Sequence, residues 1–167
     1  MIEIHPFLYF SPKKAKYLLL GSFPGKDPGN WFYGTKRTQF WSILEAVYGR
    51  KLHTKAQKEK LFTELKLAIS DVIYSAERKN NNNLDNNLIN IIFNTTLIGQ
   101  ILRKNKMEKI YFTSKFVEKI YKKEFKDLII KYQSIEFITL PSPSPRYAAM
   151  TKQEKIKIYK KLLPLSY

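Results

Sequence analysis

Apolar residues along the chain follow two patterns, short continuous runs and longer runs with helical spacing. Four short runs are typical of strands buried on both faces. They are YLLLG (17–21), LAISDVIYS (67–75), KIYFTS (109–114) and SIEFITLP (134–141). After the first run, Phe40, Ile43, Leu44 and Val47 recur at i, i+3, i+4 and i+7, which predicts an amphipathic helix. Thr38 is at the expected cap of this helix, and Gly49 is at its expected end.

Further helical patterns separate the remaining strands. Residues 55–66 and 96–104 have helical spacing, and Asp85 is the expected cap of a helix that carries Leu88, Ile89, Ile92 and Phe93. Ser114 is the expected cap of another helix, whose inward residues are Val117, Ile120, Tyr121 and Leu128. Thr151 and Glu154 are expected to form a capping box that opens the last helix.

Strands that alternate with helices favour a parallel sheet covered on both faces. We therefore predict an α/β fold with a four-stranded parallel sheet, in one domain spanning residues 1–167. No apolar run approaches the roughly 18 residues of a membrane span, and the N-terminal residues lack the pattern of a signal peptide. A cytoplasmic monomer that does not associate with membranes is the expectation.

Charge and composition narrow the choice of partner. The chain has 30 Lys and Arg against 14 Asp and Glu, a net charge of +16, and residues 101–167 hold 16 of the basic residues against 6 acidic ones. Such a field favours polyanions, of which nucleic acid is the usual one, although a coding bias toward Lys and Asn would give the same composition. The absence of cysteine excludes thiolate chemistry and cysteine-ligated metals. Since His5 and His53 are the only histidines, no metal and no cofactor are expected.

Two loops rich in Pro and Gly or Ser leave the carboxyl ends of predicted strands. GSFPG (21–25) follows the first strand, and PSPSP (141–145) follows the fourth. Ligands of open parallel sheets bind outside those carboxyl ends, so the two loops predict a site there. Gly21 and Gly25 allow backbone to approach a ligand, and Pro24 stiffens the turn. GSFPG is neither a Walker loop nor GxGxxG, and such a stretch taken alone is more often a simple turn than a site.

The second loop, PSPSP, also has two interpretations. Its serines are placed either to hold a backbone phosphate or only to form a stiff connection. Arg146 and Tyr147 follow directly and add a cation and an aromatic plane, a pair that holds and stacks nucleic acid. The alternative is a solvated arginine and a packed tyrosine.

Four segments together resemble a known family in the same order along nearly the whole chain. They are HPFLYFSPKKAKYLLLGSFPG (5–25), WFYGTKRTQFW (31–41), LAISDVIYSAERKNNNNLD (67–85) and LPSPSP (140–145). They are similar to the landmarks of the uracil-DNA glycosylase superfamily, and most similar to its hypoxanthine (deoxyinosine)-DNA glycosylase branch. The resemblance implies a three-layer α/β/α sandwich, base flipping into a pocket between these loops, and hydrolysis of the N-glycosidic bond by hydrogen-bond donors and positioned water, without cofactor.

The resemblance also implies roles for particular residues. The pocket loop would comprise Gly21, Ser22, Phe23, Pro24 and Gly25. A stacking face for the flipped base would come from Phe32, Tyr33 or Phe40. Contacts to DNA would come from Arg37, Ser142, Ser144, Arg146 and Tyr147.

Two positions depart from the family pattern. Phe23 occupies the place where other branches have the Asp or Asn that handles the water, and Thr38 replaces the asparagine on which the hypoxanthine branch relies. Threonine caps a helix as well as asparagine does, but it lacks the amide that donates and accepts at two atoms. Catalysis would then need Thr38 itself with help from Asp27 or Asn30. A Thr38→Asn change that raises activity would place the chemistry at Thr38, and an unchanged or lower activity would place it elsewhere.

Three functions follow from these observations. The first is a monofunctional DNA glycosylase of base excision repair that removes uracil or hypoxanthine from double- or single-stranded DNA. The second is a catalytically weak or inactive nucleic-acid-binding protein of the same fold, since Thr38 replaces the family asparagine. The third is an α/β protein that handles free nucleotides or nucleosides, with an incidental positive charge.

Overall fold

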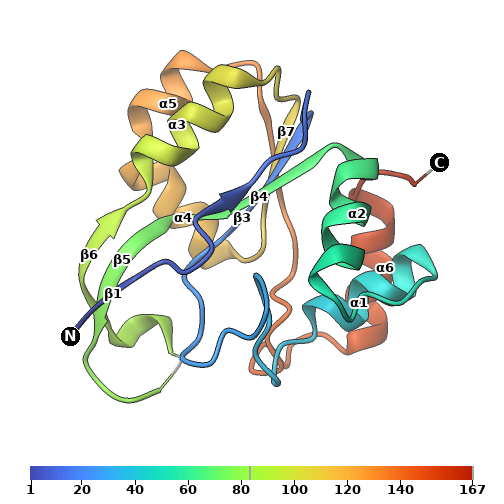
Figure 1. Ribbon diagram of the computed structural model, residues 1–167, viewed down its shortest axis with the longest axis horizontal. Helices are drawn as coiled ribbons and strands as arrows, with labels where there is room; N and C mark the ends of the chain where they lie inside the picture. The colour runs from blue at the N-terminus through green and yellow to red at the C-terminus, as the bar shows by residue number, and fades with distance from the viewer. Residues whose placement is uncertain (83, 167) are drawn as a thin grey trace.

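Strands and helices alternate around a central sheet (Figure 1). The computed structural model describes residues 1–82 and 84–166. The strands are β1 (Ile2–Ile4), β2 (Tyr9–Phe10), β3 (Tyr17–Gly21), β4 (Leu67–Asp71), β5 (Ile73–Arg78), β6 (Leu88–Phe93), β7 (Lys109–Phe112) and β8 (Glu136–Thr139). The helices are α1 (Phe40–Tyr48), α2 (Lys55–Leu65), α3 (Thr95–Lys104), α4 (Lys115–Glu124), α5 (Lys126–Lys131) and α6 (Lys152–Leu162), with one 3-10 turn, η1 (Asp85–Asn87).

The central sheet has the order β2-β4-β3-β7-β8. Strands β4, β3, β7 and β8 are parallel, so the predicted four-stranded parallel sheet is confirmed. Strand β2 adds a fifth, antiparallel strand beside β4. This addition differs from the prediction because two residues, Tyr9 and Phe10, are too few to show a strand period in the sequence.

Two apolar clusters, one on each face of this sheet, make the predicted three-layer sandwich. Helices α3 and α4 pack on one face, where Leu18, Leu20 and Ile110 point. Helices α1, α2 and α6 pack on the other face, over Leu19, Ile69 and Tyr111. Successive residues of β3 therefore contribute to opposite clusters, which explains why YLLLG is apolar throughout.

A second, antiparallel sheet has the order β1-β5-β6, and its strand β6 corrects the sequence prediction for residues 88–93. Leu88, Ile89, Ile92 and Phe93 were expected on a helix, and Asp85 was expected to cap it. These residues instead pair with β5, with register shifts between Ile73 and Ser75 and between Ser75 and Glu77. The spacing of the four apolar residues fits a helix equally well, so pairing with the preceding strand determined the structure.

Helix boundaries follow local capping chemistry. Thr54 and Gln57 form the capping box of α2, and Ser114 and Thr151 cap α4 and α6 as predicted. Helix α1 begins one residue later than expected, with Gln39 at its N-cap, and Gly49 ends it in the left-handed conformation that glycine adopts easily. Thr38 still serves the helix start, since its Oγ1 accepts a hydrogen bond from the Phe40 N–H at 3.2 Å.

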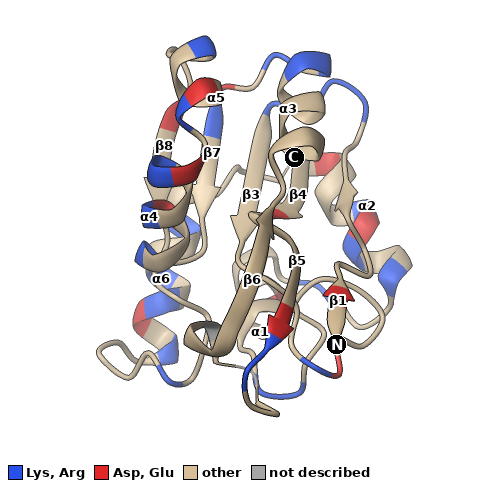
Figure 2. Cartoon of the chain, turned by 90° about the vertical axis from the view of Figure 1, so that its left-hand side faces the viewer, with Lys and Arg blue, Asp and Glu red and all other residues tan. Residues whose placement is uncertain are grey.

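Basic residues are distributed over much of the surface and recur along α4 and α6 on one side of the molecule (Figure 2). Across residues 1–82 and 84–166, no helix has the length and apolar character of a membrane span.

Candidate active site

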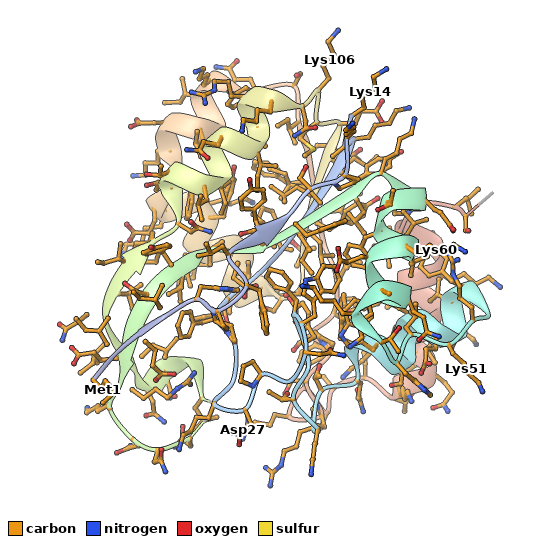
Figure 3. The ribbon with its side chains drawn as sticks, in the orientation of Figure 1. Met1, Lys14, Asp27, Lys51, Lys60 and Lys106 are labelled. Carbon is orange, nitrogen blue, oxygen red and sulfur yellow. The ribbon has the colours of Figure 1, made fainter. Side chains whose placement is uncertain are left out.

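A cavity of about 620 Å³ opens at the carboxyl edge of the central sheet. It is lined by the loops that follow β3, β7 and β8, by the end of β4, and by the Asn-rich loop between β5 and β6. Connections from β3 and β7 run in opposite directions along the sheet, which is where open α/β sheets bind ligands. Figure 3 shows Asp27 at this edge, and Lys14 and Lys106 project at the opposite edge.

Most of the residues predicted for the site line this cavity. They are Ser22, Phe23, Pro24, Gly25, Asp27, Phe32, Tyr33, Arg37, Thr38, Ser142, Ser144 and Arg146. Among the aromatic lining residues, Phe32 is buried, whereas Phe23 and Tyr33 are half-buried. Phe23 and Tyr33 therefore offer the accessible aromatic surface of the cavity.

Four predicted residues lie elsewhere. Asn30 accepts a hydrogen bond from Lys58 Nζ at 3.1 Å, on α2. Phe40 is buried and its ring stacks on Tyr33 with centroids 4.1 Å apart. Tyr147 lies against Lys155, whose Nζ is 5.6 Å from the ring centroid. Gly21, the fourth, is buried directly behind the cavity wall.

Gly21 leaves space that two polar side chains occupy. A Cβ atom at Gly21 would lie 2.2 Å from Tyr33 Oη and 2.5 Å from Asp71 Oδ1. Gly21 and Asp71 are also partners in the register of β3 and β4, so both lie at the carboxyl edge of the sheet. The glycine is required here for close approach of these oxygens rather than for contact with a ligand.

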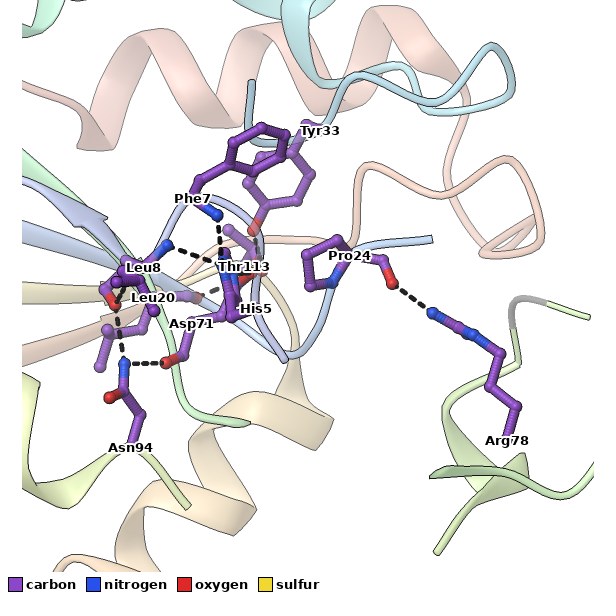
Figure 4. A network of polar contacts seen from close by, with 11 residues as sticks. His5, Phe7, Leu8, Leu20, Pro24, Tyr33, Asp71, Arg78, Asn94 and Thr113 are labelled. Carbon is purple, nitrogen blue, oxygen red and sulfur yellow. Dashed lines mark hydrogen bonds and ion pairs between the residues drawn. The ribbon is translucent and has the colours of Figure 1, made fainter. Parts of the chain in front are cut away.

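Three side chains at this depth, Tyr33, Asp71 and Thr113, all line the cavity and are called the floor below. Tyr33 donates to Thr113 Oγ1 at 2.9 Å, and Thr113 donates to the Leu20 carbonyl at 3.3 Å (Figure 4). Tyr33 has a φ of 55°, in the left-handed region that costs an ordinary residue free energy. The stacking on Phe40 and the hydrogen bond to Thr113 hold it there.

A buried pair formed by His5 and Asp71 was not predicted from the sequence. His5 Nε2 lies 2.6 Å from Asp71 Oδ2, and the Nδ1 of the same ring accepts the N–H groups of Phe7 and Leu8 at 3.1 and 2.9 Å. An acceptor nitrogen carries no proton, so the hydrogen is on Nε2 and His5 donates it to a carboxylate. Asn94 Nδ2 donates to the Asp71 carbonyl and to Ser70 Oγ, both at 3.0 Å, and so holds the end of β4 (Figure 4).

Arg78 connects the second sheet to the pocket loop. Its Nη2 donates to the Pro24 carbonyl at 2.6 Å (Figure 4), and its Nε lies 2.9 Å from Glu3 Oε2. Lys26 of the same loop contacts Asn81 Oδ1 of the Asn-rich loop. The antiparallel sheet therefore supports GSFPG from outside the central sheet.

The opposite side of the cavity, called the rim below, comprises Arg37, Thr38, Ser142, Ser144 and Arg146. Ser142 Oγ accepts the N–H of Ser144, and Ser144 Oγ accepts the N–H of Arg146, both at 3.2 Å. A hydroxyl that accepts from backbone still has its own hydrogen to donate, for example to a phosphate oxygen. Arg37 and Arg146 are exposed, so their charges face solvent.

Helix α6 supports the rim from below. Lys155, almost fully buried, donates from Nζ to Gln39 Oε1 at 3.1 Å and to the Ser144 carbonyl at 3.0 Å. Burial lowers the pKa of this ammonium group below its ordinary value. Tyr159 donates to the Pro141 carbonyl at 2.7 Å, so one face of α6 holds both ends of PSPSP.

Sequence reasoning overlooked His5, Asp71, Thr113, Arg78 and Lys155. The available signal for Asp71 was a carboxylate inside the apolar run 67–75, which was predicted as one strand. The structure divides this run into β4, which ends at Asp71, and β5, so its position at the sheet edge was not visible in the sequence. His5 gave no comparable signal, because its partner is 66 positions away. Arg78 and Lys155 resembled ordinary surface cations until the fold placed them against loop carbonyls.

Comparison with known proteins gives matches among solved structures. No family model and no curated protein matches the chain. Several solved structures do match, among them the solution NMR structure of a proposed uracil DNA glycosylase from Methanosarcina acetivorans. That match has a TM-score of 0.67 and 18% identity and covers 97% of this chain and 99% of the other. The chain therefore has a uracil-DNA glycosylase-like fold.

Proposed function

We propose that the protein is a DNA glycosylase that flips a deaminated base, uracil or hypoxanthine, out of DNA and hydrolyses its N-glycosidic bond. The observation that carries this proposal is the cavity at the carboxyl edge, which combines a buried polar floor with the half-buried aromatic rings of Phe23 and Tyr33. Its volume of about 620 Å³ lies within the range of small-ligand sites, which suits one flipped nucleotide.

The two sides of the cavity suit different parts of such a substrate. Serine hydroxyls and exposed arginines at the rim suit phosphates, because they offer donors and positive charge. Aromatic rings and the buried polar groups of the floor suit a base and its sugar. The uracil-DNA glycosylase-like fold supports the same substrate class.

The test is an excision assay on labelled duplexes with a single uracil or a single hypoxanthine. Protein in excess over DNA is expected to create abasic sites in at least one of these duplexes, which alkali then converts into strand breaks. The matched undamaged duplex is the control and is expected to remain intact. Intact strands in both damaged duplexes after long incubation would contradict the proposal.

A second candidate is a nucleic-acid-binding protein without excision activity, and the state of Thr38 favours it. Its Oγ1 is engaged by the Phe40 N–H, so this hydroxyl is partly committed to the start of α1. Binding that weakens with salt and is not followed by strand breaks would select this candidate. Absence of binding even at low salt would exclude both candidates.

A further inference from the structure

We infer that Asp71 is a catalytic carboxylate of base excision and that His5 is the residue that positions it. The inference rests on the proposed glycosylase function and concerns which group activates the water. Neither GSFPG nor the segment around Thr38 supplies a buried acidic side chain. The floor supplies one.

Position is the first argument. Two acidic residues line the described cavity, and they differ in environment: Asp27 is exposed, whereas only 4% of Asp71 is accessible. A carboxylate is costly to bury without strong partners, so its retention at the bottom of a ligand cavity calls for a role. Asp71 ends β4, and its register partner Gly21 ends β3, the strand that leads into the pocket loop.

Orientation is the second argument. His5 Nε2–H donates a hydrogen bond to Asp71 Oδ2, at 2.6 Å. The two backbone N–H groups that donate to Nδ1 fix the tautomer of the ring. Oδ1, the other oxygen, lies toward Gly21 and the Tyr33 hydroxyl. A carboxylate held by one oxygen and presenting the other has the arrangement of an oriented general base.

The chemistry that this arrangement supports is balanced as follows. The bond between C1′ of the sugar and the base nitrogen breaks, and its electron pair leaves with the base. The carboxylate of Asp71 stabilises the positive charge that develops on the sugar and accepts a hydrogen bond from a water. The water oxygen bonds to C1′, one of its protons passes to Asp71, and this proton then passes through solvent to the departed base.

The alternative role is structural, in which the pair only anchors the N-terminal segment to β4. An Asp71→Asn variant separates the two, since the amide oxygen can still accept from His5 while the negative charge is lost. The expected result is a single-turnover excision rate lower by about 10²- to 10⁴-fold, with DNA affinity preserved. Rates are normalised to the protein fraction that is folded and binds DNA, so instability alone does not mimic the loss.

Two variants control for charge and for local packing. Asp127→Asn makes the same chemical change at an exposed position of α5. Ser70→Ala removes a buried hydroxyl next to Asp71 on β4, which donates to the Leu8 carbonyl and accepts from Asn94 Nδ2. This variant is expected to lower stability, and its normalised rate is expected to fall far less than that of Asp71→Asn. His5→Gln is expected to lower the rate less than Asp71→Asn, because the carboxylate remains but is less well held.

Chemical rescue adds a measurement that distinguishes a catalytic carboxylate from a purely structural one. Formate is expected to restore part of the rate of Asp71→Ala, whereas chloride at the same ionic strength is not. Wild-type protein that cuts neither damaged duplex would remove the proposed function itself. Wild-type protein that cuts, together with an Asp71→Asn rate within about threefold of it, would overturn this inference and leave the function standing.

Discussion

The floor and the rim of the cavity are built in different ways. Floor side chains contact one another and buried groups behind them, as Tyr33 contacts Thr113 and Asp71 contacts His5. The hydroxyl oxygens of the rim serines accept hydrogen bonds from the backbone of their own loop, and the rim arginines are exposed. A fixed, dry group suits a reaction that needs accurate geometry, whereas accessible donors suit a charged backbone that must arrive and leave. We therefore expect floor variants to change rate and rim variants to change affinity.

The largest effect is expected from Gly21→Ala, which tests the floor. The new methyl group would overlap Tyr33 Oη and Asp71 Oδ1 and displace both. We expect the single-turnover excision rate to fall by at least about 10²-fold, with a much smaller change in DNA affinity. Gly49→Ala is the control, since no atom lies within 4 Å of a Cβ there and its cost is confined to backbone strain. A wild-type rate for Gly21→Ala would show that the floor tolerates displacement.

Alkaline unfolding tests the apolar layers on both faces of the central sheet, of which the layer with Tyr159 supports the rim. Burial raises the pKa of Tyr48, Tyr111, Tyr121 and Tyr159 above the ordinary value of about 10. Above about pH 10 these phenols ionise in the unfolded chain but stay protonated in the folded one. The free energy of unfolding therefore falls as pH rises. Each contributes a slope that is small below about pH 10 and approaches about 1.4 kcal/mol per pH unit above it, to be measured by urea titration between pH 9 and pH 11.

Tyr159→Phe sharpens this measurement. Above about pH 10 the variant is expected to lose at most about 1.4 kcal/mol per pH unit from the alkaline slope, because one buried phenol no longer titrates. It also leaves the Pro141 carbonyl without this donor, so DNA affinity should weaken together with the rim. An alkaline slope equal to that of wild type would contradict the account of Tyr159.

A moderate effect is expected at the rim itself. Arg146→Gln should weaken DNA binding and lower the slope of log affinity against log salt by about 0.9, as for the loss of one phosphate contact. Lys106→Gln makes the same change in charge at the opposite edge of the sheet and should leave the slope nearer that of wild type (Figure 3). Equal slopes for the two variants would mean that DNA does not follow the rim.

The smallest effect is expected from Thr38→Asn. Asparagine can accept from the Phe40 N–H as threonine does, so the start of α1 should persist. If Asp71 acts on the water, the new amide should change the excision rate by less than about threefold. A large gain in rate would move the chemistry from the floor to the rim.

The sequence predicted the framework of the fold well because its signals are local. Apolar runs marked the parallel strands, and Ser114 and Thr151 marked helix starts through their own side chains. The prediction for residues 88–93 was wrong because the spacing of Leu88, Ile89, Ile92 and Phe93 fits a helix. The local pattern does not show that β5 pairs with this segment. The two-residue strand β2 is likewise defined only by its neighbour β4.

The candidate site likewise has parts that the sequence predicts and parts that it does not. Loop positions were predictable, because Gly and Pro at the ends of strands have local meaning, and both loops do line the cavity. Asn30 and Phe40 were misplaced because the sequence does not show which way a side chain of an irregular segment turns. Asp71 acquires its environment from His5, Gly21 and Tyr33, which lie in three other segments, so its place in the cavity appears only in three dimensions.

The most direct test compares Asp71→Asn and Thr38→Asn in one single-turnover excision experiment on the duplex that the wild-type protein cuts. The account predicts that Thr38→Asn retains a rate within about threefold of wild type while Asp71→Asn loses about 10²-fold or more. The reverse order, with Asp71→Asn active and Thr38→Asn strongly altered, would contradict it.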